Sequence, residues 1–383
     1  MEEQHGFRPG RSSSTCNLVF TNYIFNAFQN QLQVDVIYND FSKAFDSVDH
    51  TTLITVLRQY GFGEPLLSWI SSYICDRYQW VKVFGVKSNV FLASSGIPQG
   101  GHLSPILFSL FLNCVHKVLH HCHFLCFADD IKLFMRVSST DDCLKLQDDL
   151  NRFSKWSNSM GLSLNLIKCK VFTYHRTKHP IVFHYSITEV NISRELNSIT
   201  DLGFKFSYNF DPMLHIDYVS CKAFKALGFI MCLAKYFKQG LSLKVLFYSI
   251  VKPILEYGSV VWDPYIALGS LQLERVQRKF LRFVSYSLNI VCPNHDYASV
   301  SYLLGLSSLA ARRRNAGINF LIGLLNGNID SPSLLSLICF RVPQRATRNN
   351  APFVVPHCLT NYAKNEPLRR LMTNANVDPN FSF

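Results

Sequence analysis

Phe124-Leu-Cys-Phe-Ala-Asp-Asp-Ile-Lys-Leu-Phe-Met-Arg-Val137 is the stretch of this sequence that decides the fold. Two apolar runs flank the acidic pair Asp129-Asp130, and this pattern predicts two β-strands joined by a tight turn. Neighbouring residues of a strand point to opposite faces of the pleat. We therefore expect one of the two carboxylates to face inward and the other to lie at the periphery.

A further carboxylate closes an apolar strand earlier in the chain. Val34-Asp-Val-Ile-Tyr-Asn-Asp-Phe41 predicts a strand that ends near Asp40. A carboxylate at the end of a buried strand is unfavourable unless it pairs with a cation, and basic residues are scarce beside both acidic segments. Asp40, Asp129 and Asp130 together offer the oxygen ligands that two Mg²⁺ ions require. This set indicates phosphoryl or nucleotidyl transfer, although an Asp-Asp pair alone is a weak signal.

Other acidic and metal-like segments have simpler interpretations. Asp141-Asp142 and Asp148-Asp149 fall on an expected helix that ends at Gly161, where we interpret them as cap and solvent-facing residues. The segment from His120 to Cys126 holds three histidines and two cysteines. Four of these are contiguous and lead into a strand, which hinders convergence on one tetrahedral ion. We interpret this segment as a loop and a buried thiol.

A glycine-rich loop precedes the acidic turn. Gly96-Ile-Pro-Gln-Gly-Gly-His-Leu-Ser-Pro105 predicts a loop that opens a helix over about 104–119, with Pro105 in its first turn. Its backbone can approach a base or sugar closely, and a helix N-terminus favours anions. The floor of a catalytic pocket and a simple helix-entry turn fit this segment equally. Elsewhere the periodicity predicts a helix capped by Asp49, strands at 170–174 and 181–185, and helices at 218–235, 243–262, 271–286 and 312–325.

Composition restricts the class of protein. The chain has 383 residues, 48% of them hydrophobic, and 38 Lys and Arg against 26 Asp and Glu, a formal charge of +12. This length allows two or three domains with a sizeable core, and the charge indicates a polyanionic partner such as nucleic acid or an anionic membrane surface. Residues 271–383 hold 13 Lys and Arg against 5 Asp and Glu, a net charge of +8. With no bilayer-spanning stretch, signal peptide or Cys-x-x-Cys pair, we expect an intracellular protein that does not enter membranes.

Several motifs occur in the order and spacing of the reverse transcriptase palm. They are Asp40-Phe-Ser-Lys-Ala-Phe-Asp46, Gly96-Ile-Pro-Gln-Gly100 with Leu103–Phe108, and Phe127-Ala-Asp-Asp130. Flanking segments look like the preceding fingers motif, the following motif, the primer grip and the thumb: Gln4–Ser12, Gly161–Asn165 with Lys168, Leu202-Gly203 and Ala226–Pro264. Together they resemble the polymerase of non-LTR (LINE-type) retrotransposons, most closely the jockey-like insect group.

The resemblance implies an α+β, right-hand polymerase fold. Residues 1–215 are expected to form partial fingers and an α/β palm, 216–290 a helical thumb, and 291–383 a basic helical C-terminal extension with a loosely ordered end. It also implies an RNA template, a DNA primer and dNTPs as partners, and a nuclear and cytoplasmic location. The earlier fingers segments and the endonuclease domain of full-length elements are expected to be absent, because the chain begins almost at the fingers motif.

The resemblance also implies roles for the acidic residues and one lysine. Asp40 and Asp129 would bind two Mg²⁺ ions, with Mn²⁺ as an alternative, and Asp130 would be the more peripheral acidic partner. Lys168 would lie near the pyrophosphate and could donate a proton to it.

Residues of the nucleotide pocket follow in the same way. Phe45 falls where the family places an aromatic gate that excludes a 2′-hydroxyl, and core packing is an alternative role. Gln99 and Gly100 would touch the incoming nucleotide and the template. Arg8 and Arg11 would hold the triphosphate, although a solvated basic face fits them equally.

Three hypotheses for the function follow. The favoured one is an RNA-directed DNA polymerase; the others are a decayed remnant that only binds nucleic acid, and an RNA-templated RNA polymerase or maturase, which fits Phe45 less well. Departures from the family pattern are Gly101-His102 after the Gln-Gly pair, Ser104 for a common Gly, and Phe127 for Tyr. They lie around the pocket and remove no catalytic group.

Overall fold

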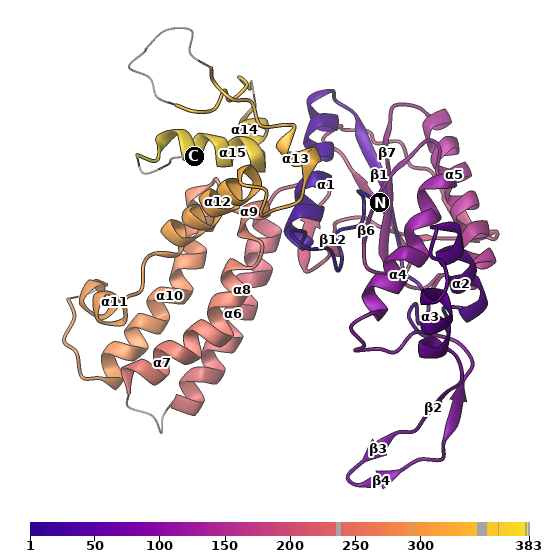
Figure 1. Cartoon of the computed structure of the whole chain (residues 1–383). Helices are drawn as coiled ribbons and strands as arrows, with labels where there is room; N and C mark the ends of the chain where they lie inside the picture. The colour runs from indigo at the N-terminus through magenta and orange to yellow at the C-terminus, as the bar shows by residue number, and fades with distance from the viewer. Residues whose placement is uncertain (235–238, 294, 343–350, 359, 380, 382–383) are drawn as a thin grey trace. The chain divides into compact units, whose positions relative to one another are not determined.

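The computed structural model describes residues 1–383 except 235–238, 294, 343–350, 359, 380 and 382–383. The chain forms two compact units (Figure 1). Unit 1 consists of Met1–Ser12 and Asn30–Leu196, and unit 2 of Ser13–Gln29 and Asn197–Phe383. The first helix, α1 (Ser13–Gln29), therefore belongs to unit 2 although its sequence lies within the segment expected to form fingers and palm.

Unit 1 is built on a five-stranded sheet with the order β11-β8-β1-β7-β6. Its strands are β1 (Gln33–Asn39), β6 (His123–Phe127), β7 (Asp130–Val137), β8 (Lys170–Tyr174) and β11 (Ser193–Glu195). Strand β1 lies at the centre and is antiparallel to both β7 and β8, whereas β11 runs parallel to β8. The predicted hairpin around Asp129 and the predicted strands before Asp40 and at 170–174 are confirmed.

Helices of unit 1 pack around this sheet. They are α2 (His50–Gln59), α3 (Leu66–Ile74), α4 (Ser104–Leu112) and α5 (Thr140–Ser159). The predicted cap of α2 is confirmed, since the Asp49 carboxylate accepts a 2.7 Å hydrogen bond from the amide of Thr52. The helix expected over 104–119 is too long, because the chain changes to a 3₁₀ turn at Asn113–Lys117. Leu112 and Val115 are fully buried three residues apart, a spacing that suits the 3₁₀ repeat.

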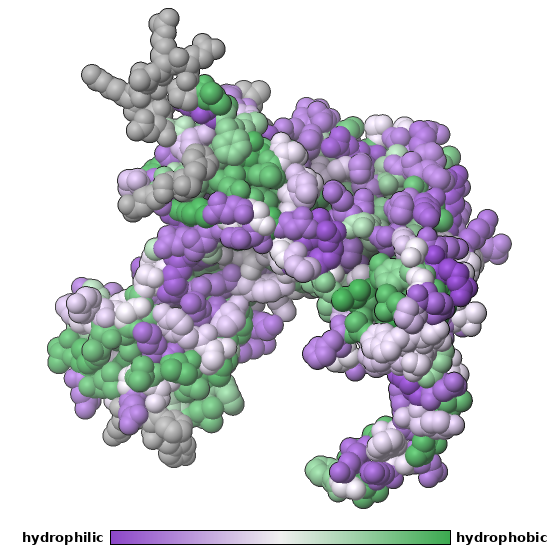
Figure 2. Space-filling model, in the orientation of Figure 1, coloured by the Kyte–Doolittle hydropathy of each residue, from purple (hydrophilic) through white to green (hydrophobic). Residues whose placement is uncertain are grey.

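Short strands complete unit 1. Strands β2 (Arg77–Gln79) and β5 (Phe91–Ala93) pair, as do β3 (Lys82–Val83) and β4 (Val86–Lys87), and together they form an arm of exposed residues at 77–93. Figure 2 shows apolar and polar side chains interleaved along this arm. Strands β9 (Ser186–Ile187) and β10 (Val190–Asn191) form a separate pair.

The strand predicted at 181–185 is wrong. Most of its bonded backbone groups pair with side chains: Ile181 exchanges hydrogen bonds of 2.7 and 2.9 Å with the side-chain amide of Gln33, and the carbonyl of Phe183 accepts a 2.6 Å bond from Arg194. The carbonyl of Tyr185 accepts a 2.9 Å bond from the backbone amide of Ile192. Because these contacts satisfy the backbone N–H and C=O groups of the segment, it does not have to pair with a neighbouring strand.

Unit 2 is predominantly helical. After the hairpin of β12 (Ser198–Asp201) and β13 (Phe204–Ser207), its helices are α6 (Met213–Leu233), α7 (Gly240–Leu246), α8 (Lys252–Glu256), α9 (Ser259–Trp262), α10 (Ala267–Ser287), α11 (Ala298–Leu304), α12 (Leu309–Leu325), α13 (Pro332–Leu335), α14 (Asn361–Lys364) and α15 (Pro367–Val377). The predicted helices at 218–233, 271–286 and 312–325 are confirmed, and the expected end of the first at Lys235 lies outside the described residues. Within the described ranges, no helix is both long and apolar enough to cross a bilayer.

The single helix predicted over 243–262 is wrong. A π-helical turn at Phe247–Val251 precedes Pro253, which has no amide hydrogen to donate and lies in the first turn of α8. Gly258 then has a φ of +57° and ends the helical path before α9. A Cβ on Gly258 would lie 2.2 Å from the ring of Phe204, so the close packing of β13 against this turn requires glycine.

A helix, α15, lies within the C-terminal segment that was expected to be loosely ordered. In α15, Leu368, Leu371 and Met372 are each 2% exposed, and the helix packs against α1 and α12. The buried carboxylate of Glu366 accepts hydrogen bonds from the amides of Leu368 and Arg369 at its start. Burial raises the pKa of this carboxyl. The composition of this segment does not reveal the amphipathic face of α15, because polar residues separate its apolar residues in the sequence.

The imidazole of His215 is buried in unit 2. It is 2% exposed and packs against the rings of Trp262 and Phe204, with centroids 4.9 and 5.9 Å away. Its Nδ1 accepts a 3.1 Å hydrogen bond from the amide of Lys205, and its buried Nε2 has no hydrogen-bond partner. Burial lowers the pKa of His215 to about 4. The folded state therefore holds this ring neutral.

Acidification from pH 7.5 to pH 5 should destabilise unit 2 through His215. The imidazole of the unfolded chain has a pKa near 6.5 and is protonated below that pH, whereas the buried ring of the folded chain stays neutral. The free energy of unfolding therefore falls as the pH drops below about 6.5. A folded pKa of about 4 corresponds to a loss of about 2 kcal/mol at pH 5. H215Q retains a hydrogen-bond acceptor but cannot be protonated in this pH range. Its free energy of unfolding in urea should therefore fall by about 2 kcal/mol less than that of the wild-type protein between pH 7.5 and pH 5. An identical pH dependence in both proteins would contradict this assignment.

Candidate functional site

The predicted acidic residues meet at one edge of the sheet in unit 1. Strands β1 and β7 pair with Asn39 opposite Ile131, so Asp40 follows β1 at the edge where Asp130 begins β7. Ala128 and Asp129 form the two-residue turn between β6 and β7, because Phe127 lies opposite Asp130. Asp40 and Asp129 are partly exposed and Asp130 is exposed. Two segments almost 90 residues apart in sequence thus bring carboxylates to one place.

Lys168 lies beside Asp40. Its Nζ is 3.2 Å from Oδ2 of Asp40, and its side chain is 65% exposed. The pairing is fixed by the backbone, since the amide of Asn165 donates to the carbonyl of Asp40 at 2.8 Å and the amide of Ser42 donates to the carbonyl of Ser163 at 2.8 Å. The segment from Gly161 to Lys168 is therefore held against the residues that follow β1.

The chemistry of Asp40 fits a divalent cation. Its Oδ2 is buried and has no hydrogen bond, and the ammonium of Lys168 is the cationic group beside it. A buried carboxylate oxygen without a hydrogen bond is costly, and hard cations such as Mg²⁺ select carboxylate oxygens of this kind. In the part of the chain that the structure describes, Asp40, Asp129 and Asp130 do not come within 4.8 Å of one another as a set of three. The fold brings these residues to one edge but does not draw all three carboxylates together.

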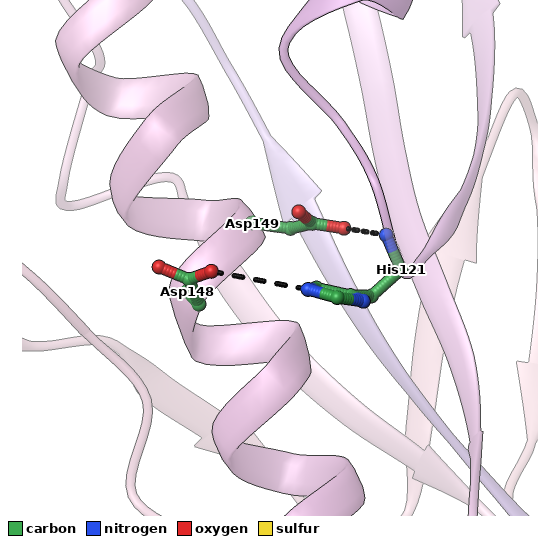
Figure 3. Close-up of side chains that lie close together, drawn as sticks. All are labelled: His121, Asp148 and Asp149. Carbon is green, nitrogen blue, oxygen red and sulfur yellow. Dashed lines mark hydrogen bonds and ion pairs between the residues drawn. The ribbon is translucent and has the colours of Figure 1, made fainter.

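Another group of three side chains does meet this distance. His121, Asp148 and Asp149 each place one possible metal-ligand atom within 4.8 Å of the other two (Figure 3). Asp149 is fully buried, and its carboxylate accepts backbone hydrogen bonds of 2.7 to 3.2 Å from His120, His121 and Cys122. Asp148 is half exposed and forms a 2.8 Å ion pair with Arg152 one helical turn away. Because backbone amides and Arg152 already satisfy these carboxylates, the cluster is explained as a loop anchor. The interpretation of 120–126 as a loop holds for 120–122, whereas 123–126 belong to β6.

The expectation that Asp149 faces solvent is wrong. Asp149 lies three residues after Leu146, which is fully buried, so it belongs to the inner face of α5. Its burial also affects the neighbouring thiol, since desolvation and the nearby Asp149 carboxylate raise the pKa of Cys122. Cys122 is accordingly held as an unreactive thiol.

Replacement of Asp149 should be far more damaging than replacement of its neighbour Asp148. D149A leaves three backbone amides without their acceptor and opens a cavity on the buried face of α5, so we expect a loss of about 3 kcal/mol of unfolding free energy. D148A removes the i,i+4 ion pair with Arg152 and a 4.0 Å contact with His121, both at the surface, and its effect should stay within about 0.5 kcal/mol. Urea unfolding of both variants measures the difference. Equal losses would show that Asp149 is not the anchor of this loop.

Phe45 is held rigidly by other rings. It stacks on Phe108 with a centroid distance of 4.4 Å and an interplanar angle of 19°, and it meets the edge of Phe7 at 6.3 Å and 88°. Its carbonyl accepts a 3.0 Å hydrogen bond from the amide of Ile97. The ring is partly buried, so it packs in the core and also presents a surface.

The glycine-rich loop is fastened to the residues after Asp40. Gly96 has a φ of +83°, and a Cβ there would lie 2.8 Å from the backbone of Asp46, so only glycine fits. The carbonyl of Gly96 accepts a 2.6 Å bond from Arg77 and lies 2.8 Å from Nε2 of His50. The side-chain Nε2 of Gln99 donates a 2.9 Å hydrogen bond to the Asp46 carboxylate.

Gly100 and a surface hollow lie next along this loop. Gly100 has a φ of +81° and is exposed with open space around its Cα, which suits close approach of another molecule. The hollow beside the loop is lined in part by Asp46, Arg77, Gln79, Gly96, Pro98 and Gln99. Sequence reasoning assigned no role to Asp46 or Arg77. Asp46 is the last residue of the motif Asp40–Asp46 and could have been recognised as a site residue from it. Arg77 belongs to no motif that would have identified it.

Arg8 and Arg11 both contact the start of the chain. The guanidinium of Arg8 donates to the carbonyl of Met1 at 2.6 Å, and that of Arg11 donates to the carbonyl of Glu2. Both side chains are partly exposed. Their assignment to a triphosphate stays a prediction.

Comparison with known proteins identifies the family. Residues 1–231 match the family model described as reverse transcriptase (RNA-dependent DNA polymerase). The chain is similar to the probable RNA-directed DNA polymerase from transposon X-element of Drosophila melanogaster, with 24% identity over 295 residues, and to the RNA-directed DNA polymerase from mobile element jockey of that species, with 26% identity over 298 residues. Each match covers 74% of this chain and 32% of the relative, so the chain spans about a third of these relatives' length.

A solved structure of apo telomerase from Candida tropicalis is similar at 14% identity, with a TM-score of 0.42 over 80% of this chain and 48% of that one. The resemblance to non-LTR retrotransposon polymerases is confirmed by the relatives, and the mixture of helices and sheet agrees with the expected polymerase fold. Because the family model matches more than half of its residues, the chain belongs to the reverse transcriptase (RNA-dependent DNA polymerase) family.

Proposed function

We propose that this chain is an RNA-directed DNA polymerase core, which extends a DNA primer on an RNA template with dNTPs. The observation that carries the proposal is the sheet edge at which Asp40, whose buried Oδ2 has no hydrogen bond and lies 3.2 Å from the Lys168 ammonium, meets the Asp129-Asp130 turn. Two Mg²⁺ ions, or Mn²⁺ in their place, held by Asp40 and Asp129 with Asp130 at the periphery, would supply Lewis-acid activation of the primer 3′-hydroxyl and neutralise charge on the pyrophosphate.

Lys168 would act on the leaving group. In nucleotidyl transfer the bond between the α-phosphorus and the bridging oxygen breaks, and the departing pyrophosphate gains negative charge. The Lys168 ammonium lies 3.2 Å from Asp40 Oδ2 on a side chain that is 65% exposed, so it borders the edge where the triphosphate would lie. From there it can donate a proton to the pyrophosphate oxygen.

Phe45 would select the sugar. Its ring is fixed between Phe108 and Phe7 and therefore yields little to an added hydroxyl at the 2′ position. Gln99, fastened to Asp46, and the open backbone of Gly100 would contact the nucleotide and the template. Arg8 and Arg11 would bind the triphosphate through their guanidinium groups.

Primer extension on an RNA template with Mg²⁺ and dNTPs tests the proposal. Wild-type protein should extend the primer, and D129N/D130N should not, because it lacks the anionic oxygens that hold the cations. The matched control D141N/D148N changes two exposed acidic residues of α5 and should retain activity. No extension by wild-type protein, together with salt-sensitive binding of an RNA–DNA hybrid, would overturn the proposal and leave a protein that only binds nucleic acid.

The same assay tests the gate. F45V should lower the preference for dNTPs over NTPs by about 10- to 200-fold, the range that one removed steric contact provides. If F45V kept the wild-type preference for dNTPs over NTPs, Phe45 would be a core residue and not the gate.

A basic face in unit 2 would bind the phosphate backbone. Exposed cations lie on two neighbouring helices: Lys222 and Lys225 on α6, and Arg275, Arg278, Lys279 and Arg282 on α10. Not all of the positive C-terminal charge is available in this way. Arg312 and Arg313 are ion-paired internally with Glu256 and Asp263, each at 2.6 Å.

Salt dependence of hybrid binding tests this face. R278Q/K279Q should weaken binding and lower the magnitude of the slope of log Kd against log salt by about 2, because each lost phosphate contact contributes about 1. The control K117Q/K155Q removes two exposed lysines of unit 1 and should leave the slope unchanged. Fluorescence anisotropy with a labelled RNA–DNA hybrid measures both. Equal slopes in all three proteins would place the nucleic-acid interface elsewhere.

A further inference from the structure

The first residues of the chain are built into the edge of the sheet beside the acidic turn. Gln4 forms a parallel bridge with Cys126 of β6. The amide of His5 donates to the carbonyl of Cys126 at 2.8 Å, and the amide of Cys126 donates to the carbonyl of Glu3 at 2.9 Å. These bonds carry Gln4 and Gly6 alongside the end of β6, where the turn begins.

The side chain of Gln4 binds the turn itself. It is 2% exposed, and its Oε1 accepts hydrogen bonds from the amides of Ala128 at 3.0 Å and Gly6 at 2.8 Å. Its Nε2 donates to the carbonyl of Ala128 at 3.3 Å. One buried amide thus engages both backbone polar groups of the residue that precedes Asp129.

Ala128 needs this support because its backbone is strained. Its φ is +57°, in the left-handed region that residues with a Cβ avoid. Gly6 lies directly against it: a Cβ on Gly6 would come within 2.2 Å of the Ala128 nitrogen and 3.0 Å of its Cα. Contact from Gly6 and hydrogen bonds from Gln4 therefore act on the same strained residue from one side.

We infer that Gln4, with Gly6, is a positioning residue for the Asp129 carboxylate: its amide holds the Ala128 turn in the conformation that Asp129 needs to bind a divalent cation. The inference rests on the proposed function, in which Asp129 is a metal ligand. Strain at functional turns persists only where surrounding contacts enforce it, and small displacements of a ligand are costly to its site. Gln4 supplies those contacts here from 124 residues away.

The test compares Q4M with Q33M. Methionine keeps an unbranched chain of similar length and removes the hydrogen bonds. Gln33 is a matched control, because it is also buried, at 4% exposed, and also makes three side-chain hydrogen bonds, with Asp35 and Ile181, at the end of β1 remote from Asp40. Mn²⁺ binding in the presence of dNTP, followed by electron paramagnetic resonance of the free ion, gives a readout that does not require turnover.

Q4M should weaken Mn²⁺ binding at least 10-fold, accelerate hydrogen exchange at the Ala128 amide, and raise the Mg²⁺ concentration needed for primer extension. Q33M should change Mn²⁺ affinity less than 2-fold. Q4E provides a second variant should Q4M fail to fold: a carboxylate still accepts from Ala128 and Gly6 but cannot donate to the Ala128 carbonyl, so its loss should be intermediate. Equal effects of Q4M and Q33M on Mn²⁺ affinity would overturn the inference.

A double mutant identifies the mechanism. Glycine adopts positive φ freely, so A128G removes the strain that Gln4 opposes. In the A128G background, Q4M should cost no more than about 3-fold in Mn²⁺ affinity, whereas an undiminished 10-fold loss would show that Gln4 does not act through this turn. Primer extension by wild-type protein judges the proposed function separately, since a wild-type protein that binds Mn²⁺ at Asp129 but fails to extend leaves the positioning role intact.

Discussion

Strand β1 pairs with β7 so that Asn39 lies opposite Ile131, and this register brings Asp40 to the edge where the Asp129-Asp130 turn lies. A slip of one residue would turn each side chain to the other face of the sheet. Both faces of β1 are buried, so apolar packing alone specifies the register weakly. A buried carboxylate adds specificity where β1 pairs with β8. Asp35 is fully buried and accepts hydrogen bonds from Thr173, which lies opposite it on β8, and from Tyr185.

Asp35 and Asp40 show two outcomes for carboxylates of the same strand region. Burial raises the pKa of Asp35, and hydroxyl groups of Thr173 and Tyr185 satisfy its oxygens, so it serves the fold. Asp40 lies at the open edge with a buried oxygen that has no hydrogen bond and with Lys168 beside it. The same sheet thus satisfies one carboxylate internally, and we propose that the other, beside Lys168, binds an external cation.

Local pattern was sufficient to predict the elements that carry the acidic residues. The two apolar runs that flank Asp129-Asp130 and the strand pattern before Asp40 led to the correct strands, and the cap at Asp49 was correct. Elements shaped by distant contacts were not predictable: the break at Gly258 depends on Phe204, and the burial of Asp149 depends on amides of the loop at 120–122. In the site, Lys168 could be placed by resemblance, whereas the contact of Gln4 with Ala128 joins residues 124 apart and has no local signature.

We propose that divalent cations bind at the edge formed by the end of β1 and the β6–β7 turn. Crystals grown with Mn²⁺, a dNTP and a primer–template hybrid, examined by anomalous diffraction at the manganese edge, would locate these cations. We expect anomalous peaks within bonding distance of Oδ2 of Asp40 and the carboxylate of Asp129, with Asp130 at the periphery. Peaks at His121, Asp148 and Asp149 in place of that edge, or no peak at Asp40 while the dNTP is bound, would contradict it.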